Sequence, residues 1–579
     1  MMEIEYLHKE NLIQTLKRTP SNSIDAIVLI TGKHDSSGLD EIKTCLDEGA
    51  RVLKNGGLLF VQGRPEYLPD LGVYLDQRLT FKYWIAIQST LHRPTAGLPS
   101  VHAAVLLFTK GHGRFNINRV RFPHEYCAFC GKPLRDWGGK THLMHPEGYA
   151  ISDVWTSLPP ADNYTQISKP VLDTILKLID HEPQASESYP MLDGYSNSSH
   201  WHKRVIIAPR ESVEGMNRSV AQPALQYHLP GLEPNLSSHL ITKTLDAGLW
   251  NVVHHGDAVE ILKQYPDNSI DLVFADPPYN LDKSYNIYND ELESKAYLSW
   301  CNAWLQEYIR ILKPTGSLYL LNLPRWSMYH ASFLNKRLYF QNWIVWDALS
   351  EPRGKLMPAH YGLLFYTKHP TDFTFNYEQF KEIESHQFCL RSSCIRKRKL
   401  SGIDNKEPLT DIWSDIHRLK HRRDRDYHPC QLPDALLERI IRLSTNEGDI
   451  VLDALVGTGT TVVTAARLGR RYVAIDIDET YVAITREKLR QVENQGYVQR
   501  RSIRRKRTRY SKKELQLELK RLALTLGRLP TPEDVQQFSS YSLEAFTETF
   551  PTWGKALKAA KLEVHNNGSS KNNFPGSME

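Results

Sequence analysis

The sequence predicts an α/β protein in which a doubly wound sheet occurs twice, followed by a small all-α domain at the C-terminal end. Three observations predict this arrangement. They are a strand–turn–helix–strand unit at residues 449–478, an internal repeat relating residues 1–180 to residues 245–430, and leucines at helical spacing beyond residue 510. Alternating strands and helices are typical of parallel sheets.

The glycine-containing unit is the clearest local signal. An apolar run ends at Asp453, Gly457 and Gly459 follow in a tight turn, and helical periodicity begins directly afterwards. A second apolar run ends at Asp476, nineteen positions after the first glycine. Glycines in such a turn let a ligand approach the backbone, and the acidic residue can accept hydrogen bonds from ribose hydroxyls. The unit therefore predicts a site for a nucleoside-containing cofactor.

The loop itself narrows the choice of cofactor. A dinucleotide-binding loop would have a third glycine near the position of Val462, and a phosphate-binding loop would have a lysine after its second glycine. Neither feature is present. A nucleoside without phosphates, such as S-adenosylmethionine, fits the loop better.

An internal repeat relates the two halves of the chain. Residues 16–33 align without gaps to residues 262–279, so that Asn22-Ser23-Ile24-Asp25 pairs with Asn268-Ser269-Ile270-Asp271. Further matches follow in the same order: 50–61 with 309–320, 102–110 with 360–368, and 152–155 with 410–413. We expect the two halves to share one α/β architecture.

The halves differ at the end of one strand. Residues 273–280 read VFADPPYN, and the two prolines must end the preceding strand because they cannot donate to a ladder. One reading of Asp276-Pro277-Pro278-Tyr279 is a rigid turn; the other is a ligand site at the carboxyl end of a strand. The first half has Ile30-Thr31-Gly32-Lys33 there, with neither carboxylate nor ring. We therefore expect chemistry only in the second half.

The composition is that of a globular protein. The 579 residues are 41% hydrophobic, which is enough for several domains. No run of about eighteen apolar residues occurs, so we expect a cytoplasmic protein with no membrane partner. The seven cysteines are too few and too unevenly spread for a disulfide framework, which agrees with a reducing compartment.

Three motifs together resemble the DNA amino-methyltransferases, in the group whose catalytic motif precedes the glycine loop. The D-P-P-Y motif matches residues 276–279, the H-P-x-Q-x-P segment matches residues 428–433, and D-P-F-x-G-S-G-T-T matches residues 453–461. The match covers about residues 245–492, in the family's order. Ala454 and Leu455 replace the usual Pro-Phe, which changes the wall expected beside the adenine of the cofactor.

The resemblance implies a Rossmann-like, S-adenosylmethionine-dependent methyltransferase fold that is partly duplicated. Asp276 and the Pro277 carbonyl would accept hydrogen bonds from the exocyclic amino group of a target base, and Tyr279 would stack on that base once it is flipped from the duplex. An initial Asp in the motif usually accompanies adenine and an initial Ser cytosine, so N6 of adenine is favoured over N4 of cytosine. The catalytic set implied is Asp276, Pro277, Pro278 and Tyr279, and the cofactor-binding set is Asp453, Gly457, Gly459, Thr460, Asp476, Gln431 and Pro433.

Basic residues point to double-stranded DNA as the partner. The net charge is only +6, but lysine and arginine concentrate at 396–399, 417–425 and 500–513. Such runs favour a polyanion, although any one of them is also consistent with a solvated or disordered segment. The residues expected to contact DNA are Arg422, Arg423, Arg504, Arg505, Lys506 and Arg507.

The C-terminal segment predicts a small helical module. Leu515, Leu519, Leu522 and Leu526 have helical spacing, and two further short helices fit after Pro532 and around Trp553. The segment resembles the homing-endonuclease-associated repeat, and an accessory role in DNA binding is favoured over a protein-interaction role. The expected domains are 1–180 (catalytically blank), 181–244 (linker), 245–492 (catalytic), 493–513 (basic linker), 514–562 (helical module) and 563–579 (disordered tail).

Four cysteines suggest a metal site. Cys127 and Cys130 form a C-x-x-C knuckle, and the repeat sets this region against Cys389, with Cys394 close by. Four thiolates could close a tetrahedral zinc site that joins the two halves. A local set with His142 and His145 is a rival, and reduced cysteines in ordinary packing are the third possibility.

The leading hypothesis is thus a DNA adenine methyltransferase of a prokaryotic restriction–modification or solitary modification system, associated with the nucleoid. A cognate restriction endonuclease is a possible partner. The alternatives are a cytosine-N4 enzyme and a catalytically silent DNA-binding protein. Because relatives often work as homodimers, the first half would supply a built-in second subunit; a homodimer is the other possibility.

Overall fold

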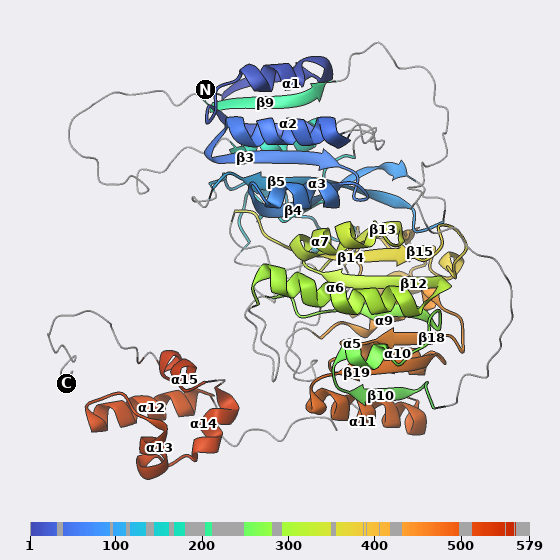
Figure 1. The fold of residues 1–579 in the computed structure, drawn as a ribbon, viewed down its shortest axis with the longest axis vertical. Coiled ribbons are helices and arrows are strands. Elements are labelled where there is room, and N and C mark those ends of the chain that lie inside the picture. Colours follow the sequence, from blue (N-terminus) through green and yellow to red (C-terminus); the bar gives the residue numbers. More distant parts are fainter. Residues whose placement is uncertain are drawn as a thin grey trace. The chain divides into compact units, whose positions relative to one another are not determined.

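The structure is a computed structural model of the whole chain. It describes residues 2–31, 39–92, 96–111, 116–134, 144–160, 167–179, 203–210, 248–280, 292–348, 355–385, 387–389, 391–403, 406–416, 418, 431–496, 512–550, 552–560 and 562. The chain divides into two units, residues 1–498 and residues 499–579. The first unit contains a seven-stranded and an eight-stranded sheet with two small strand pairs, and the described part of the second unit is helical (Figure 1).

The first sheet is built from the N-terminal half. Its strands lie in the order β1-β9-β2-β3-β5-β4-β8. The elements are β1 (Met2–His8), α1 (Lys9–Arg18), β2 (Ile24–Ile30), α2 (Leu39–Val52), β3 (Leu53–Gly63), α3 (Leu68–Asp76), β4 (Thr80–His92), β5 (Ser100–Thr109), β8 (Val154–Trp155), α4 (Lys169–Ile179) and β9 (Lys203–Arg210), with β6 (Arg121–Phe122) and β7 (Tyr149–Ala150) as a separate pair. Strands β1 to β3 are parallel, and β5 runs antiparallel to its neighbours β3 and β4.

The second sheet has eight strands in the order β10-β19-β18-β11-β12-β14-β13-β17. Its elements are β10 (Val252–His255), α5 (Ala258–Leu262), β11 (Ile270–Ala275), α6 (Ser294–Ile311), β12 (Leu312–Asn322), α7 (Pro324–Leu334), β13 (Tyr339–Asp347), β14 (His360–Thr367), β17 (Ile412–Trp413), α9 (Asp434–Ser444), β18 (Ile450–Asp453), α10 (Thr460–Arg467), β19 (Arg471–Asp476) and α11 (Glu479–Gln495). Between β14 and β17 lie a short 3-10 turn (Tyr377–Gln379), the strand pair β15 (Glu382–Glu384) and β16 (Lys406–Pro408), and helix α8 (Ser392–Leu400).

The same contacts recur at the positions that the repeat pairs. Asp25 accepts hydrogen bonds from Lys54 Nζ and the Arg204 amide, and Asp271 accepts them from Lys313 Nζ and the Ile450 amide. Lys110 Nζ donates to the Asn22 side chain and the carbonyls of Arg51 and Leu53; Lys368 Nζ donates to Asn268, Arg310 and Leu312 in the same way. Asn22 and Asn268 both have positive φ, 57° and 55°.

Strand β9 departs from the expected domain boundary. The interval 181–244, expected to be a linker throughout, contains β9, which lies between β1 and β2 and is parallel to both. Its apolar residues, Val205 to Ala208, are buried in the core of the first half. The sequence did not predict this strand of eight residues, because the interval around it is rich in polar and turn-forming residues. In the sheet, β9 takes the place that β18 has in the second half.

The two halves meet through reciprocal contacts. Asp411 of the second half accepts hydrogen bonds from the Val101 and His102 amides of the first, at 2.9 and 3.2 Å. Asp153 of the first half accepts one from the Ala359 amide of the second, at 2.7 Å, and its carboxylate lies 3.1 Å from the ring of His360. The repeat pairs Asp153 with Asp411 and His102 with His360. Such self-complementary contacts are those of a two-fold interface.

Aromatic rings lie at the centre of this interface. Trp84 and Trp343, which occupy matching positions on β4 and β13, stack with ring centroids 3.7 Å apart and an angle of 9° between their planes. On either side, Tyr83 donates to the Leu356 carbonyl and Asn342 bonds both backbone groups of Leu98. Helices α3 and α7 pack against each other beside them.

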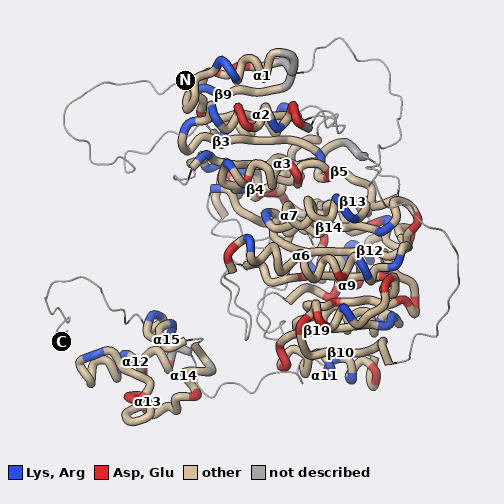
Figure 2. Tube along the Cα trace, viewed as in Figure 1, with Lys and Arg blue, Asp and Glu red and all other residues tan. Residues whose placement is uncertain are grey.

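The C-terminal unit contains α12 (Lys512–Leu526), α13 (Pro532–Phe538), α14 (Leu543–Thr549) and α15 (Trp553–Ala559) around a core that includes Leu515, Leu519 and Leu522. The expected helices are present, but α14 was not predicted. Its seven residues are too few for the periodicity of a helix to stand out, although Phe546 is buried in the core. Figure 2 shows basic residues along α12 and α15.

Among the residues that the structure describes, no helix is both long and apolar enough to cross a membrane.

Candidate active site

The carboxyl ends of three parallel strands bring acidic residues to one edge of the second sheet. β18 lies between β11 and β19, with Phe274 beside Asp453 and Asp453 beside Ala474. Asp276 follows the last residue of β11, Asp453 ends β18 and Asp476 ends β19. In open α/β sheets this is the edge at which ligands bind. The glycine loop and the D-P-P-Y motif, far apart in sequence, are therefore neighbours at one edge.

The D-P-P-Y turn is held by a network of hydrogen bonds. The Tyr279 hydroxyl donates to Asp276 Oδ1 at 2.7 Å. Trp326 Nε1 donates to the Tyr279 carbonyl at 2.9 Å, and the Tyr297 hydroxyl donates to the Pro278 carbonyl at 2.8 Å. Asn280 closes the turn in the left-handed region, with φ of 53°. The turn is rigid, and it fixes the direction of the Asp276 carboxylate.

Tyr279 is more enclosed than its expected role requires. Its side chain is only 2% exposed, and its ring lies 5.6 Å from that of Tyr361, which stacks in turn on Trp346. A base could stack on Tyr279 only after neighbouring groups move. The hydrogen bond from its hydroxyl shows a second role, since Tyr279 orients Asp276.

The glycine loop follows β18 and opens α10. Gly457 and Gly459 both have positive φ, 52° and 84°, and Gly459 is the residue that precedes the helix. A Cβ at Gly459 would lie 2.7 Å from Thr485 Oγ1, so the position has no room for a side chain. Gly457 is therefore required because of its positive φ. Gly459 is required because of its positive φ and because Thr485 leaves no room for a Cβ. Thr460 begins the helix directly after them.

Helix α11 braces the back of the loop. Thr485 donates to the Gly457 carbonyl at 3.2 Å, and Lys488 Nζ donates to the Thr458 carbonyl at 2.6 Å. Lys488 is 4% exposed. Neither residue stands out in the sequence, because a lysine in an amphipathic helix is normally at the surface. The sequence feature that could have indicated them is the spacing of Thr485 and Lys488, three positions apart, on the helix that follows Asp476.

Asp476 is oriented by backbone amides. Gly457 N–H donates to Oδ2 and Asp478 N–H donates to Oδ1, each at 2.8 Å. Burial raises the pKa of Asp476 to about 6, although the two amides act in the opposite direction. Burial likewise raises the pKa of Asp453 to about 7, against a hydrogen bond from Thr461. The site thus holds two carboxyl groups that change charge near neutral pH.

Tyr308 connects the two motifs. From α6 its hydroxyl donates to the Phe274 carbonyl at 3.2 Å and accepts from the Ala454 amide at 2.9 Å. Tyr297, Trp326 and Tyr308 were all missed from the sequence. They lie on helices α6 and α7, 19 to 146 residues from their partners, and nothing local marks them.

The first half lacks these groups. Through the strand register, Ile206 corresponds to Leu452 and Ile207 to Asp453, so the carboxylate at the end of β18 is replaced by isoleucine. The position of Asp276 is taken by Ile30, and within the described residues no helix–strand pair corresponding to α10 and β19 follows β9.

Of the remaining predicted site residues, the structure describes Gln431 and Pro433 and leaves the others undescribed. Gln431 is half-buried, and Pro433 directly precedes α9. Arg422, Arg423, Arg504, Arg505, Lys506 and Arg507 lie outside the described residues, as does His428.

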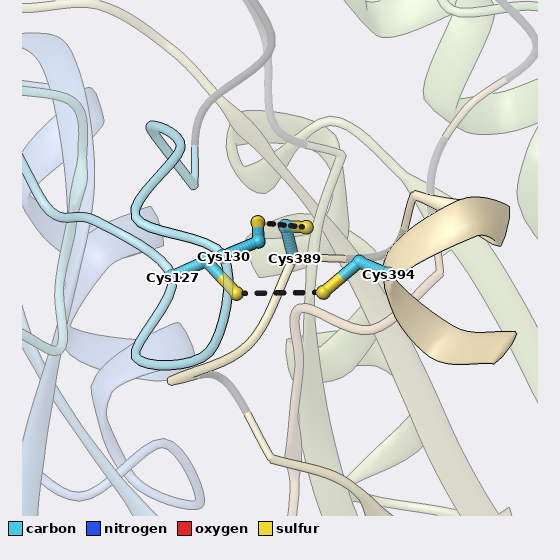
Figure 3. A group of neighbouring side chains, drawn as sticks. All are labelled: Cys127, Cys130, Cys389 and Cys394. Carbon is cyan, nitrogen blue, oxygen red and sulfur yellow. Dashed lines mark hydrogen bonds between the residues drawn. The ribbon is translucent and has the colours of Figure 1, made fainter. Parts of the chain in front are cut away.

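The four predicted cysteines do come together. Cys127, Cys130, Cys389 and Cys394 have sulfur atoms within 4.8 Å of one another (Figure 3). Of the rival ligands, His142 lies outside the described residues, and His145 is exposed and belongs to no such cluster among the residues described.

Two family models match the chain. The model described as DNA methylase matches residues 270–487, and the model described as homing endonuclease associated repeat matches residues 510–563. The Type II methyltransferase M.BamHI of Bacillus amyloliquefaciens is 39% identical over 233 residues, which are 39% of this chain and 54% of that protein. The chain thus spans about half the length of this relative.

Other relatives are matched over more of their length. The Type II methyltransferase M.HpaI of Haemophilus parainfluenzae is 36% identical, with 40% of this chain and 72% of that protein covered. The DNA adenine methyltransferase YhdJ of Escherichia coli K12 is 32% identical, with 39% and 79% covered. A solved structure of the cytosine-N4-specific PvuII DNA methyltransferase is 19% identical over 43% of this chain and 89% of that chain, with a TM-score of 0.31.

Proposed function

The chain belongs to the DNA methylase family, and on that premise we propose that it transfers a methyl group from S-adenosylmethionine to N6 of adenine at a specific DNA site. The observation that carries the proposal is the meeting of Asp276 and the glycine loop at one edge of the second sheet. A donor bound at the loop and a base held at Asp276 would be neighbours there. The first half would take no part in the chemistry.

The loop fits a nucleoside cofactor without phosphates. Asp476, with both oxygens oriented by amides, can accept hydrogen bonds from the two ribose hydroxyls. The loop from Ala454 to Thr461 contains no lysine or arginine to pair with a phosphate. The Lys488 ammonium group, which contacts the loop from helix α11, donates to the Thr458 carbonyl. Bound S-adenosylmethionine would supply an activated methyl group on a sulfonium.

Asp276 would act on the target nitrogen. The lone pair of an exocyclic amino group is delocalised into the base, which makes the nitrogen a poor nucleophile. Hydrogen bonds from both of its N–H groups to Asp276 and the Pro277 carbonyl would favour a tetrahedral nitrogen whose lone pair points to the methyl group. The nitrogen would gain the methyl group as the methyl–sulfur bond of the cofactor breaks and leaves a neutral thioether, and it would pass a proton to the Asp276 carboxylate and from there to solvent. Positioning supplies most of the acceleration, and no covalent intermediate with the protein is needed.

The choice of adenine rests on the initial Asp of the motif. The relative YhdJ is described as an adenine methyltransferase, and the PvuII enzyme as specific for cytosine N4. The test is mass spectrometry of nucleosides from duplex DNA incubated with purified protein and S-adenosylmethionine. We expect N6-methyladenine. N4-methylcytosine would replace the adenine assignment and keep the mechanism, whereas no modified nucleoside would favour a silent DNA-binding protein.

Cofactor binding should depend on pH. The pKa of Asp476 is raised to about 6, mainly by burial, so below that pH the carboxyl is neutral and a weaker acceptor for ribose hydroxyls. Affinity for S-adenosylmethionine should therefore rise with pH from 5 to 7 by about tenfold as Asp476 ionises. Titration calorimetry at several pH values measures this. In Asp476→Asn the dependence near pH 6 should be lost; the same dependence in the variant would contradict the assignment.

A single chain should be a complete unit. The Trp84–Trp343 stack and the reciprocal contacts of Asp153 and Asp411 already bury a two-fold interface inside one chain. We propose that the first half serves as a built-in second subunit, suited to an asymmetric DNA site. Light scattering after size exclusion should give the mass of one chain, 66.7 kDa, at micromolar concentration. A stable mass of two chains would contradict this.

The C-terminal unit would add affinity for DNA. It carries basic residues on α12 and α15, and its sequence includes the arginine-rich segment 500–513. Contacts to phosphates would strengthen binding without selecting a sequence. The chain would then work in a restriction–modification system, with a cognate endonuclease, or as a solitary modification enzyme.

A further inference from the structure

Two cysteines lie in a tight turn of the first half. Cys127 N–H donates to the Lys132 carbonyl at 2.8 Å, and Gly131 N–H donates back to the Cys127 carbonyl at 2.9 Å. Gly131 has φ of +64°, which a glycine adopts without strain. The turn places the Cys127 and Cys130 side chains on the same side (Figure 3). A C-x-x-C turn closed by glycine is a frequent half-site for zinc.

The other two cysteines come from the second half. Cys389 follows a turn in which Phe388 N–H donates to the Ser385 carbonyl, and Cys394 lies in the first turn of α8. Both are buried, at 3% and 4% exposed. In Figure 3 their sulfur atoms point toward those of Cys127 and Cys130.

The distances match a tetrahedral thiolate site. The Cys127 and Cys394 sulfurs are 3.7 Å apart and those of Cys130 and Cys389 are 3.6 Å apart. All four sulfurs lie within 4.8 Å of one another. A tetrahedron with zinc–sulfur bonds of about 2.3 Å has edges of about 3.8 Å. The Cys127–Cys394 and Cys130–Cys389 distances are therefore already at the edge length, and each joins one half of the chain to the other.

The surroundings of the four cysteines are apolar, since Phe388, Phe129 and Leu134 pack around them. Zinc would give the four converging sulfurs a common partner within this apolar shell.

We propose that Cys127, Cys130, Cys389 and Cys394 bind one structural zinc ion that joins the two halves of the chain. Each half supplies two ligands, so neither closes the site alone. All four positions of the tetrahedron are taken by sulfur, which makes the site structural rather than catalytic. The proposal does not depend on the methyltransferase activity.

The site would also fix helix α8. Two hydrogen bonds among the described residues join the knuckle to the second half: Ala128 N–H donates to the Gln387 carbonyl, and the Arg391 side chain donates to the Pro133 carbonyl. The helix carries Arg396, Lys397 and Lys399 on its exposed side. If the proposed function holds, zinc would thus position a basic helix for contact with DNA phosphates.

The test is metal analysis of the purified full chain by inductively coupled plasma mass spectrometry. We expect one zinc per chain, and none in the double variant Cys389→Ser/Cys394→Ser. Cys45→Ser should keep its zinc, because Cys45 lies in α2 away from the cluster. A wild-type chain without metal after purification with zinc present would overturn the proposal, and so would full zinc in the double variant.

A second readout does not depend on the variants folding. Replacement of zinc by cobalt in the wild-type chain should give the strong visible absorption and the thiolate charge-transfer bands of a tetrahedral sulfur site. Their absence would overturn the proposal. Intact mass without reductant tests the alternative of two disulfides, which would lower the mass by the hydrogens lost. Both measurements are independent of DNA modification, so failure of the proposed function would be seen separately.

Discussion

Asp276→Asn is expected to lower the rate of methyl transfer by about 100- to 1,000-fold while leaving the fold intact. The asparagine oxygen can still accept the Tyr279 hydroxyl, which in the native chain bonds Asp276 Oδ1. Its amide nitrogen, however, would present N–H donors to an amino group that must itself donate. The loss should fall on turnover in single-turnover kinetics, and the affinity for S-adenosylmethionine should change little.

The first half offers a control at the end of the equivalent strand. Thr31 lies one position beyond Ile30, the residue that corresponds to Asp276, and Thr31→Ala should leave the rate unchanged. Asp276→Ala should lose activity too, but with a lower melting temperature, because it leaves the buried Tyr279 hydroxyl without this acceptor. An Asp276→Asn chain that retains the native rate would remove Asp276 from the mechanism.

Gly459→Ala is expected to weaken S-adenosylmethionine binding by about 10- to 100-fold. An alanine at φ of 84° is strained by about 1–3 kcal/mol, and its Cβ would lie 2.7 Å from Thr485 Oγ1. Thr485 would have to move, and with it the hydrogen bond that it donates to the Gly457 carbonyl. The loop that approaches the cofactor would shift. Calorimetry or equilibrium dialysis measures the change.

Gly469 offers the control for strain alone. It lies beyond the other end of α10 with φ of 74°, and a Cβ there meets only Glu447, at 3.7 Å. Gly469→Ala should cost similar stability and leave cofactor affinity near the native value. Equal affinities in the two variants would contradict a cofactor-binding role for the loop.

The sequence could predict those parts of the site whose backbone conformation is determined by a few consecutive residues. The turn at Gly457 and Gly459 needs glycine for local reasons, and the prolines after Asp276 end a strand wherever they occur. That these motifs meet follows from the rule that parallel strands present their carboxyl ends at one edge. In the structure β11 and β18 are neighbours, with Phe274 beside Asp453.

What the sequence could not supply depends on contacts between distant segments. Lys488 and Tyr308 act through carbonyl and amide groups of the loop, and their sequence context is that of ordinary helical residues. The burial of Tyr279 results from packing against Tyr361, 82 positions away in sequence. Strand β9 was not predicted because a short apolar run inside a polar interval gives little periodicity. Its position between β1 and β2 depends on tertiary packing, which the local sequence does not reveal.

The central claim is tested most directly by single-molecule sequencing of DNA from cells that express the chain, compared with cells that express Asp276→Asn. The account predicts methyladenine in one short sequence motif, present with the native chain and absent with the variant. Methylation that persists in the variant would contradict it, because catalysis would then not depend on Asp276. Expression of both chains at equal levels, confirmed by immunoblot, makes the comparison decisive.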